Sequence, residues 1–123
     1  MSESRSPNLQ LIYVSDISRS TEYYSKVFNC EPKFKSPRYV VFPIDGQACF
    51  AIWSGGDAPD RNVPRFSEIG IMLPTDGDVV DLYHQWKNNP HIEISKALYS
   101  DVFGQTFLVK DPDGHIIRIC SVD

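Results

Sequence analysis

The sequence predicts an α+β fold built from two βαβββ modules, and three observations support this prediction. A strand, a helix and three further strands can be traced twice along the 123 residues, in the same order. Each half places an Asp-Gly pair, Asp45-Gly46 or Asp113-Gly114, before its last strand. A segment rich in glycine, proline and charged residues separates the two halves. Repetition of element order is typical of two half-sheets of similar construction.

The first half begins with a strand that leads into a capped helix. Leu9–Val14 is rich in β-forming residues, and either Asp16 or Ser18 can cap the helix that follows. Apolar residues then recur at near-helical spacing, and the helix should stop by Asn29 because a proline follows. Three short strands complete this half: Lys33–Lys35, Tyr39–Pro43 and Ala48–Trp53.

The second half repeats this order after a connector at about residues 55–66. A strand at Ser67–Leu73 precedes a helix that begins at Thr75-Asp76 and ends near Asn88. Three further strands follow: Ile92–Leu98, Phe103–Lys110 and His115–Ser121. We therefore expect a single domain over residues 1–123, with module one at about residues 8–54 and module two at about residues 67–121.

Composition and charge exclude several classes of function. The net charge is −4 at pH 7 and no basic run occurs, which argues against a nucleic-acid partner. No apolar stretch approaches the roughly 20 residues that cross a membrane. The polar segment Met1–Pro7 lacks the apolar core of a signal peptide. These features predict a cytoplasmic protein.

Alternation along the strands predicts two kinds of sheet face, because side chains two residues apart share a face. Strongly apolar rows, such as Phe50 with Ile52 and Ile117 with Ile119, should pack under the helices. We expect curved half-sheets with helices on the convex side. The opposite rows should line the concave side: Leu9, Leu11 and Tyr13; Cys49, Ala51 and Trp53; Glu68, Gly70 and Met72; Ile116, Arg118 and Cys120.

The concave rows suit a planar aromatic guest. Tyr13 and Trp53 offer flat faces, and Met72 adapts to irregular shapes. Tyr39 and Phe42 have opposite parity, so that either could form a wall of the binding site. Phe107 could face the concave side or pack beneath it, because parity in its long strand is ambiguous.

Glu68 and Arg118 are the two charged residues of the concave rows. They should come from neighbouring strands, and we expect them to form an ion pair. Two alternatives remain open at this point. Arg118 could hold the carboxylate of a guest by bidentate hydrogen bonds, or both residues could be solvated at the rim.

Several ordered motifs resemble the vicinal-oxygen-chelate superfamily of glyoxalases, ring-cleaving dioxygenases and bleomycin-resistance proteins. They are Leu11–Asp16 with Ser20 and Tyr23-Tyr24, Phe103–Phe107, and Asp111–Gly114. Four other segments are very like phenazine antibiotic resistance proteins: Pro7–Leu11, Pro37–Tyr39, Ala51–Gly56 and Pro64–Ile71. This resemblance implies the paired βαβββ fold, a homodimer, and a protein that binds a planar aromatic antibiotic.

The same resemblance gives four positions that hold a metal ion in the metal-dependent members. In this sequence they are matched by Leu9, Ala51, Glu68 and Arg118, of which Glu68 alone can ligate a metal. We therefore predict a non-enzymatic protein without metal or other cofactor, which sequesters its aromatic guest. The alternatives are a metal-dependent, glyoxalase-like enzyme and a metal-free enzyme in which Glu68 is the base. Arg118 beside Glu68 would weaken that base.

Overall fold

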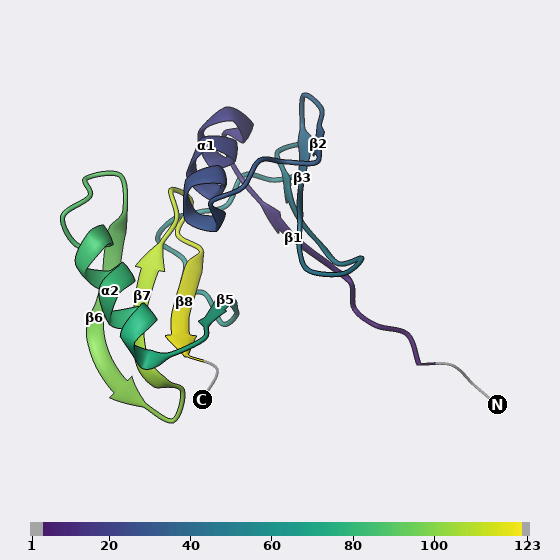
Figure 1. Cartoon of the computed structure of the whole chain (residues 1–123). Coiled ribbons are helices and arrows are strands. Elements are labelled where there is room, and N and C mark those ends of the chain that lie inside the picture. Colours follow the sequence, from purple (N-terminus) through teal and green to yellow (C-terminus); the bar gives the residue numbers. More distant parts are fainter. Residues whose placement is uncertain (1–3, 122–123) are drawn as a thin grey trace. The chain divides into compact units, whose positions relative to one another are not determined.

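The computed structural model describes residues 4–121 and divides into two compact units, Met1–Pro59 and Asp60–Asp123. The boundary falls within the predicted connector. Residues 1–3 of the polar N-terminal segment lie outside the described residues, as do residues 122–123. Each unit contains a four-stranded sheet and a helix packed on one of its faces (Figure 1). No helix within residues 4–121 is long and apolar enough to cross a membrane.

The first unit has the predicted order of elements. They are β1 (Leu9–Tyr13), α1 (Ile17–Phe28), β2 (Phe34–Lys35), β3 (Tyr39–Pro43) and β4 (Cys49–Trp53). The strand order in the sheet is β1-β4-β3-β2. The pair β1–β4 is parallel, whereas the other two pairs are antiparallel.

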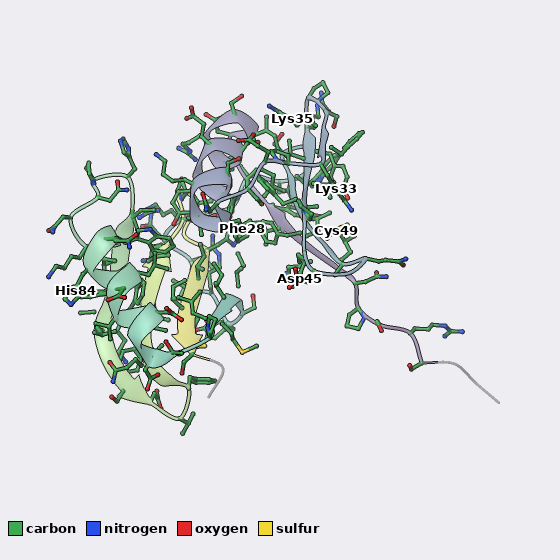
Figure 2. The ribbon with its side chains drawn as sticks, viewed as in Figure 1. Phe28, Lys33, Lys35, Asp45, Cys49 and His84 are labelled. Atoms are coloured by element: carbon green, nitrogen blue, oxygen red, sulfur yellow. The ribbon has the colours of Figure 1, made fainter. Side chains whose placement is uncertain are left out.

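Helix α1 begins and ends as the sequence predicts. The side chain of Asp16 accepts a hydrogen bond from the backbone N–H of Arg19 at 3.1 Å, so Asp16 rather than Ser18 is the N-cap. Asn29 ends the helix in the left-handed conformation with φ 52°. The Phe28 ring packs against Phe50 with centroids 5.0 Å apart. In Figure 2, Phe28 lies on the helix side of this sheet.

The second unit repeats the architecture of the first. Its elements are β5 (Glu68–Leu73), α2 (Asp76–Trp86), β6 (Glu93–Asp101), β7 (Gly104–Lys110) and β8 (Ile116–Ser121). The strand order is β5-β8-β7-β6, with β5 and β8 parallel. Helix α2 packs on β7 and β8 (Figure 1), and Ile117 and Ile119 are fully buried. The apolar row predicted on β8 therefore does lie under the helix.

Strand β6 is longer than predicted. The sequence suggests a strand that stops at Leu98, but pairing with β7 continues until Asp101 meets Gly104. Gly104 has φ +77°, a conformation that glycine adopts without strain, and it allows a turn of only two residues, Val102 and Phe103. Register shifts between Ile94 and Tyr99 interrupt the alternation that would have revealed the strand's true length.

The Asp111–Gly114 segment forms the turn between β7 and β8. Asp111 is fully buried, and its Oδ1 accepts the backbone N–H groups of Asp113 at 2.9 Å and His115 at 2.8 Å. Gly114 has φ +91°, which only glycine adopts readily. The carboxylate of Asp111 thus fixes the turn from inside.

Two arginines from the start of the second unit fasten onto this turn. Nη1 of Arg61 donates to the carbonyl oxygens of Asp111 at 2.9 Å and Pro112 at 3.0 Å. Nη2 of Arg65 donates to the carbonyl oxygen of Asp113 at 2.7 Å. The later part of the predicted connector is therefore bound to the hairpin rather than extended into solvent.

Candidate functional site

Each sheet has one face covered by its helix and one face turned away from it, which we call the first and the second open face. On the first open face, four aromatic side chains form a row across the strands. Trp53 on β4 lies between its register partners Tyr13 on β1 and Tyr39 on β3. Phe34 on β2 continues the row beyond Tyr39, with ring centroids 6.3 Å apart.

Two rings of this row contact each other edge to face, and others are exposed to solvent. Tyr39 meets Trp53 at 6.4 Å between centroids with an interplanar angle of 71°. Tyr13 is 47% exposed and Phe34 is 52% exposed, while Trp53 is partly buried. Exposed aromatic side chains held by neighbours on a sheet provide flat apolar surface to which another ring can stack.

Phe42, which was a candidate for the binding site, does not belong to this face. Its side chain is fully buried on the helix side and contacts Phe28 at 5.7 Å between ring centroids. The register of β3 with β4 decides the matter, because Tyr39 pairs with Trp53 and Phe42 pairs with the core residue Phe50. Tyr39 is therefore the residue of the two that lies on the open face.

The second open face carries the predicted ion pair between Glu68 and Arg118. Nε and Nη2 of Arg118 donate to Oε1 and Oε2 of Glu68 at 2.7 and 3.0 Å, a bidentate geometry. Nη1 donates to the hydroxyl oxygen of Tyr99 at 3.1 Å. The guanidinium also lies 4.6 Å from the centroid of the Phe103 ring.

The surroundings of this pair favour its charged form. The pKa of Arg118 is raised above its already high value, chiefly because the Glu68 carboxylate accepts its hydrogen bonds. The Arg118 side chain is 18% exposed and that of Glu68 is 37% exposed, so the pair is neither buried nor freely solvated. Cys120 neighbours it on β8, and burial raises the pKa of its thiol, which makes it a poor nucleophile.

Met72 lies on the second open face as predicted, but Phe107 does not. Met72 is 67% exposed. Phe107 is fully buried beneath α2, with ring centroids 5.2 Å from Tyr83 and 6.0 Å from Trp86. Phe107 is therefore a core residue, because its strand position faces the helix.

Sequence reasoning missed Phe34, Tyr99 and Phe103. Phe34 lies in a two-residue strand, which is too short for alternation to reveal a face. Tyr99 follows a register shift in β6 that obscures its parity. Phe103 lies in the two-residue turn before Gly104. An aromatic residue directly before a turn glycine is the one feature of the sequence that could have indicated its place at the site.

Comparisons with known proteins agree with this architecture. The chain belongs to the glyoxalase/bleomycin resistance protein/dioxygenase superfamily, whose model matches residues 7–119. A crystal structure of a glyoxalase-related enzyme from Fulvimarina pelagi has a TM-score of 0.78 at 18% identity, over 96% of this chain and 88% of the other. This likeness concerns the fold, and it confirms the predicted α+β arrangement of βαβββ modules.

Two relatives are a resistance protein and a transferase. The chain is 59% identical over 119 residues to the phenazine antibiotic resistance protein EhpR of Enterobacter agglomerans, covering 95% of this chain and 92% of that protein. It is 27% identical over 103 residues to the metallothiol transferase FosB of Staphylococcus saprophyticus, covering 83% of this chain and 67% of that protein.

The four positions that the family resemblance assigns to a metal do not fit one. Leu9 and Ala51 offer no donor atoms, and the positively charged Arg118 occupies both carboxylate oxygens of Glu68. Over residues 4–121, no three His, Cys, Asp or Glu side chains gather into a group that could hold a metal ion. We therefore derive no chemical step through a metal at these positions.

Proposed function

We propose that this protein is a non-enzymatic antibiotic-resistance protein that binds and sequesters a planar aromatic antibiotic of the phenazine kind. The observation that carries the proposal is the 59% identity, over 95% of the chain, to a phenazine antibiotic resistance protein. The aromatic row of the first open face supports the proposal independently.

Stacking on this row supplies the proposed binding energy. A ring pair contributes roughly 0.5–1.5 kcal/mol beyond the burial of its area, and burial of a tricyclic ring adds more. Micromolar affinity requires about 8 kcal/mol in total. We propose Trp53 as the main stacking surface, with Tyr39 and Tyr13 at its two sides.

The second open face is proposed to contact ligand through Arg118, Glu68 and Met72. Arginine has five N–H donors. Three of these donate to Glu68 and Tyr99, which leaves two for an acidic group of a ligand. Arg118→Met should therefore weaken binding of phenazine-1-carboxylate more than binding of phenazine. An equal effect on both compounds would oppose a carboxylate contact.

The proposal is tested by fluorescence titration of a Trp86→Phe variant, which leaves Trp53 as the sole tryptophan. Phenazine and phenazine-1-carboxylate should quench its emission saturably, and mass spectrometry should recover both compounds unchanged. Trp53→Leu in the unmodified background should weaken binding about tenfold or more by calorimetry. Phe66→Leu is the control, since Phe66 is 98% exposed. Absence of saturable binding would refute the proposal.

The alternative function is that of a glyoxalase-like or metal-free enzyme acting on a small molecule. The similarity to a metallothiol transferase is the observation in its favour. Against it, the base would have to be Glu68, whose two oxygens are both engaged by Arg118. A product detected by mass spectrometry after incubation with either phenazine would favour the enzyme.

We further propose a cytoplasmic homodimer, as the family resemblance implies. Light scattering coupled to size exclusion should then give twice the chain mass of 14.0 kDa. A mass equal to that of the single chain would contradict the dimer.

A further inference from the structure

Two glycines directly after β4 let the main chain pass close to the aromatic row. A Cβ built on Gly55 would lie 2.3 Å from both Cη2 and Cζ2 of Trp53 and 2.9 Å from Cε2. A Cβ built on Gly56 would lie 2.7 Å from Cε2 of Tyr13 and 3.0 Å from Nε1 of Trp53. No side chain larger than hydrogen fits at residue 55 with the indole in this place.

The glycines are needed for space and not for backbone conformation. Neither has a positive φ, in contrast to Gly46, Gly104 and Gly114. Any residue could therefore adopt the backbone at residues 55 and 56, provided that the rings of Trp53 and Tyr13 moved away.

The distances also say which side of the indole is covered. An atom beyond the edge of the ring near Cη2 and Cζ2 would lie distinctly farther from Cε2 than from these two atoms. The Cβ position at Gly55 is 2.3 Å from Cη2 and Cζ2 but only 2.9 Å from Cε2, so it lies above the Cζ2–Cη2 edge of the ring and not beyond that edge in the ring plane. The chain at Gly55 thus closely backs one face of the Trp53 indole, and stacking is left to the opposite face.

We infer that Gly55 and Gly56 are positioning residues that back the Trp53 indole, so that it presents a single face to one planar ring. This inference rests on the proposed function. Its consequence is selectivity by orientation, since the angle of the indole, and not merely its presence, fixes where a tricyclic guest can stack.

The test is Gly55→Ala, with Gly77→Ala as the matched control. A Cβ on Gly77 meets only Thr75 Oγ1 at 3.6 Å, an ordinary contact. Both substitutions are made in the Trp86→Phe background, so that emission and acrylamide quenching report on Trp53. Gly55→Ala should shift the emission, increase the quenching and raise the Kd for phenazine about tenfold. Gly77→Ala should change none of these.

A second experiment separates positioning of the Trp53 indole from a general structural role of Gly55. It repeats Gly55→Ala together with Trp53→Phe. The smaller ring removes the clash, so calorimetry should show no further loss of phenazine affinity relative to Trp53→Phe alone. If Gly55→Ala alone does not fold, the combination should restore folding, and failure to do so would overturn the inference. Equal losses in both backgrounds would overturn it, as would unchanged Trp53 emission.

Failure of the proposed function would look different. If the unmodified protein does not bind phenazine, the proposed function is refuted. The emission and acrylamide measurements then still decide whether Gly55 positions the indole, because they require no guest.

Discussion

The family resemblance places an acidic metal ligand at the position of Arg118. In this chain the Arg118 guanidinium instead binds Glu68, which matches another of the four ligand positions. Glu68 receives two hydrogen bonds from Arg118, and Tyr99 and Phe103 hold the guanidinium from other sides. At these two positions the second open face therefore carries a hydrogen-bonded ion pair where the family resemblance places metal ligands.

Removing one member of this pair should destabilise the protein. Arg118→Met keeps an apolar stem but leaves the Glu68 carboxylate without its partner, and we expect a loss of about 1–2 kcal/mol in the free energy of unfolding. Urea unfolding at neutral pH measures this loss. Adding Glu68→Gln should recover part of it, because the unpaired charge is removed.

Arg38→Met is the control for this prediction, since Arg38 is an exposed arginine of the first unit. It should change the unfolding free energy by less than about 0.5 kcal/mol. If Arg118→Met had an equally small effect, the pair would contribute no stability.

At the scale of elements, α2 is tied to the sheet of the second unit by the carboxylate of Asp76. Its Oδ1 accepts the backbone N–H of Gln105 at 2.9 Å, and Ser121 also donates to it. These hydrogen bonds lower the pKa of Asp76 below its usual 3.8, with the Gln105 contact as the larger cause. The start of the helix is thus joined to β7 and β8.

This contact should make part of the stability depend on pH. Because the folded pKa of Asp76 is lower than its unfolded value of 3.8, its contribution is complete above that pH and is lost as pH falls through the folded pKa. Asp76→Asn should therefore lower the urea midpoint at neutral pH and flatten its decline below pH 3.8. Asp78→Asn, in the same helical turn, serves as control; an identical acid profile for both variants would contradict the prediction.

The sequence predicted most elements and the side of the sheet on which several residues lie, and the failures have a physical pattern. Tyr13, Trp53 and Arg118 were placed by alternation, which is regular in strands without bulges. To decide which face Phe42 lies on, the register between β3 and β4 is needed, and the sequence of one strand does not give that register. Phe107 lies in a strand whose partner β6 is irregular, so parity there could not be fixed in advance.

The backing of Trp53 by Gly55 could not be predicted either. A Ser-Gly-Gly segment after a strand indicates a flexible loop when it is read alone. The role of Gly55 depends on how closely the main chain approaches the Trp53 ring in the folded protein. That distance is a property of packing and not of local propensity.

On the scale of the whole molecule, the protein carries two open faces of different chemistry. The first carries an uncharged aromatic row, and the second carries an ion pair and an exposed methionine. Among the residues that the structure describes, neither face gathers the donors that a divalent metal requires.

Metal should consequently have no effect on the protein. Samples dialysed against EDTA and samples supplemented with zinc, manganese or magnesium should share one melting temperature and one Kd for phenazine. A ligand at a hundred times its dissociation constant stabilises by about 2.7 kcal/mol, which a thermal-shift assay readily detects. A rise in melting temperature with one metal, together with stoichiometric metal in the purified protein, would contradict this expectation.

The two arginines on the β7–β8 turn have a consequence for how freely this segment can vary. Arg61 and Arg65 bind main-chain oxygens, so they recognise the path of the backbone and are indifferent to the side chain at residue 112. Gly114 has no such freedom, since its φ is +91° and an added Cβ would meet the Arg61 carbonyl oxygen at 3.0 Å. Over evolutionary time the turn can therefore exchange its proline, while Gly114 stays fixed by its own backbone conformation and by the main chain at residue 61.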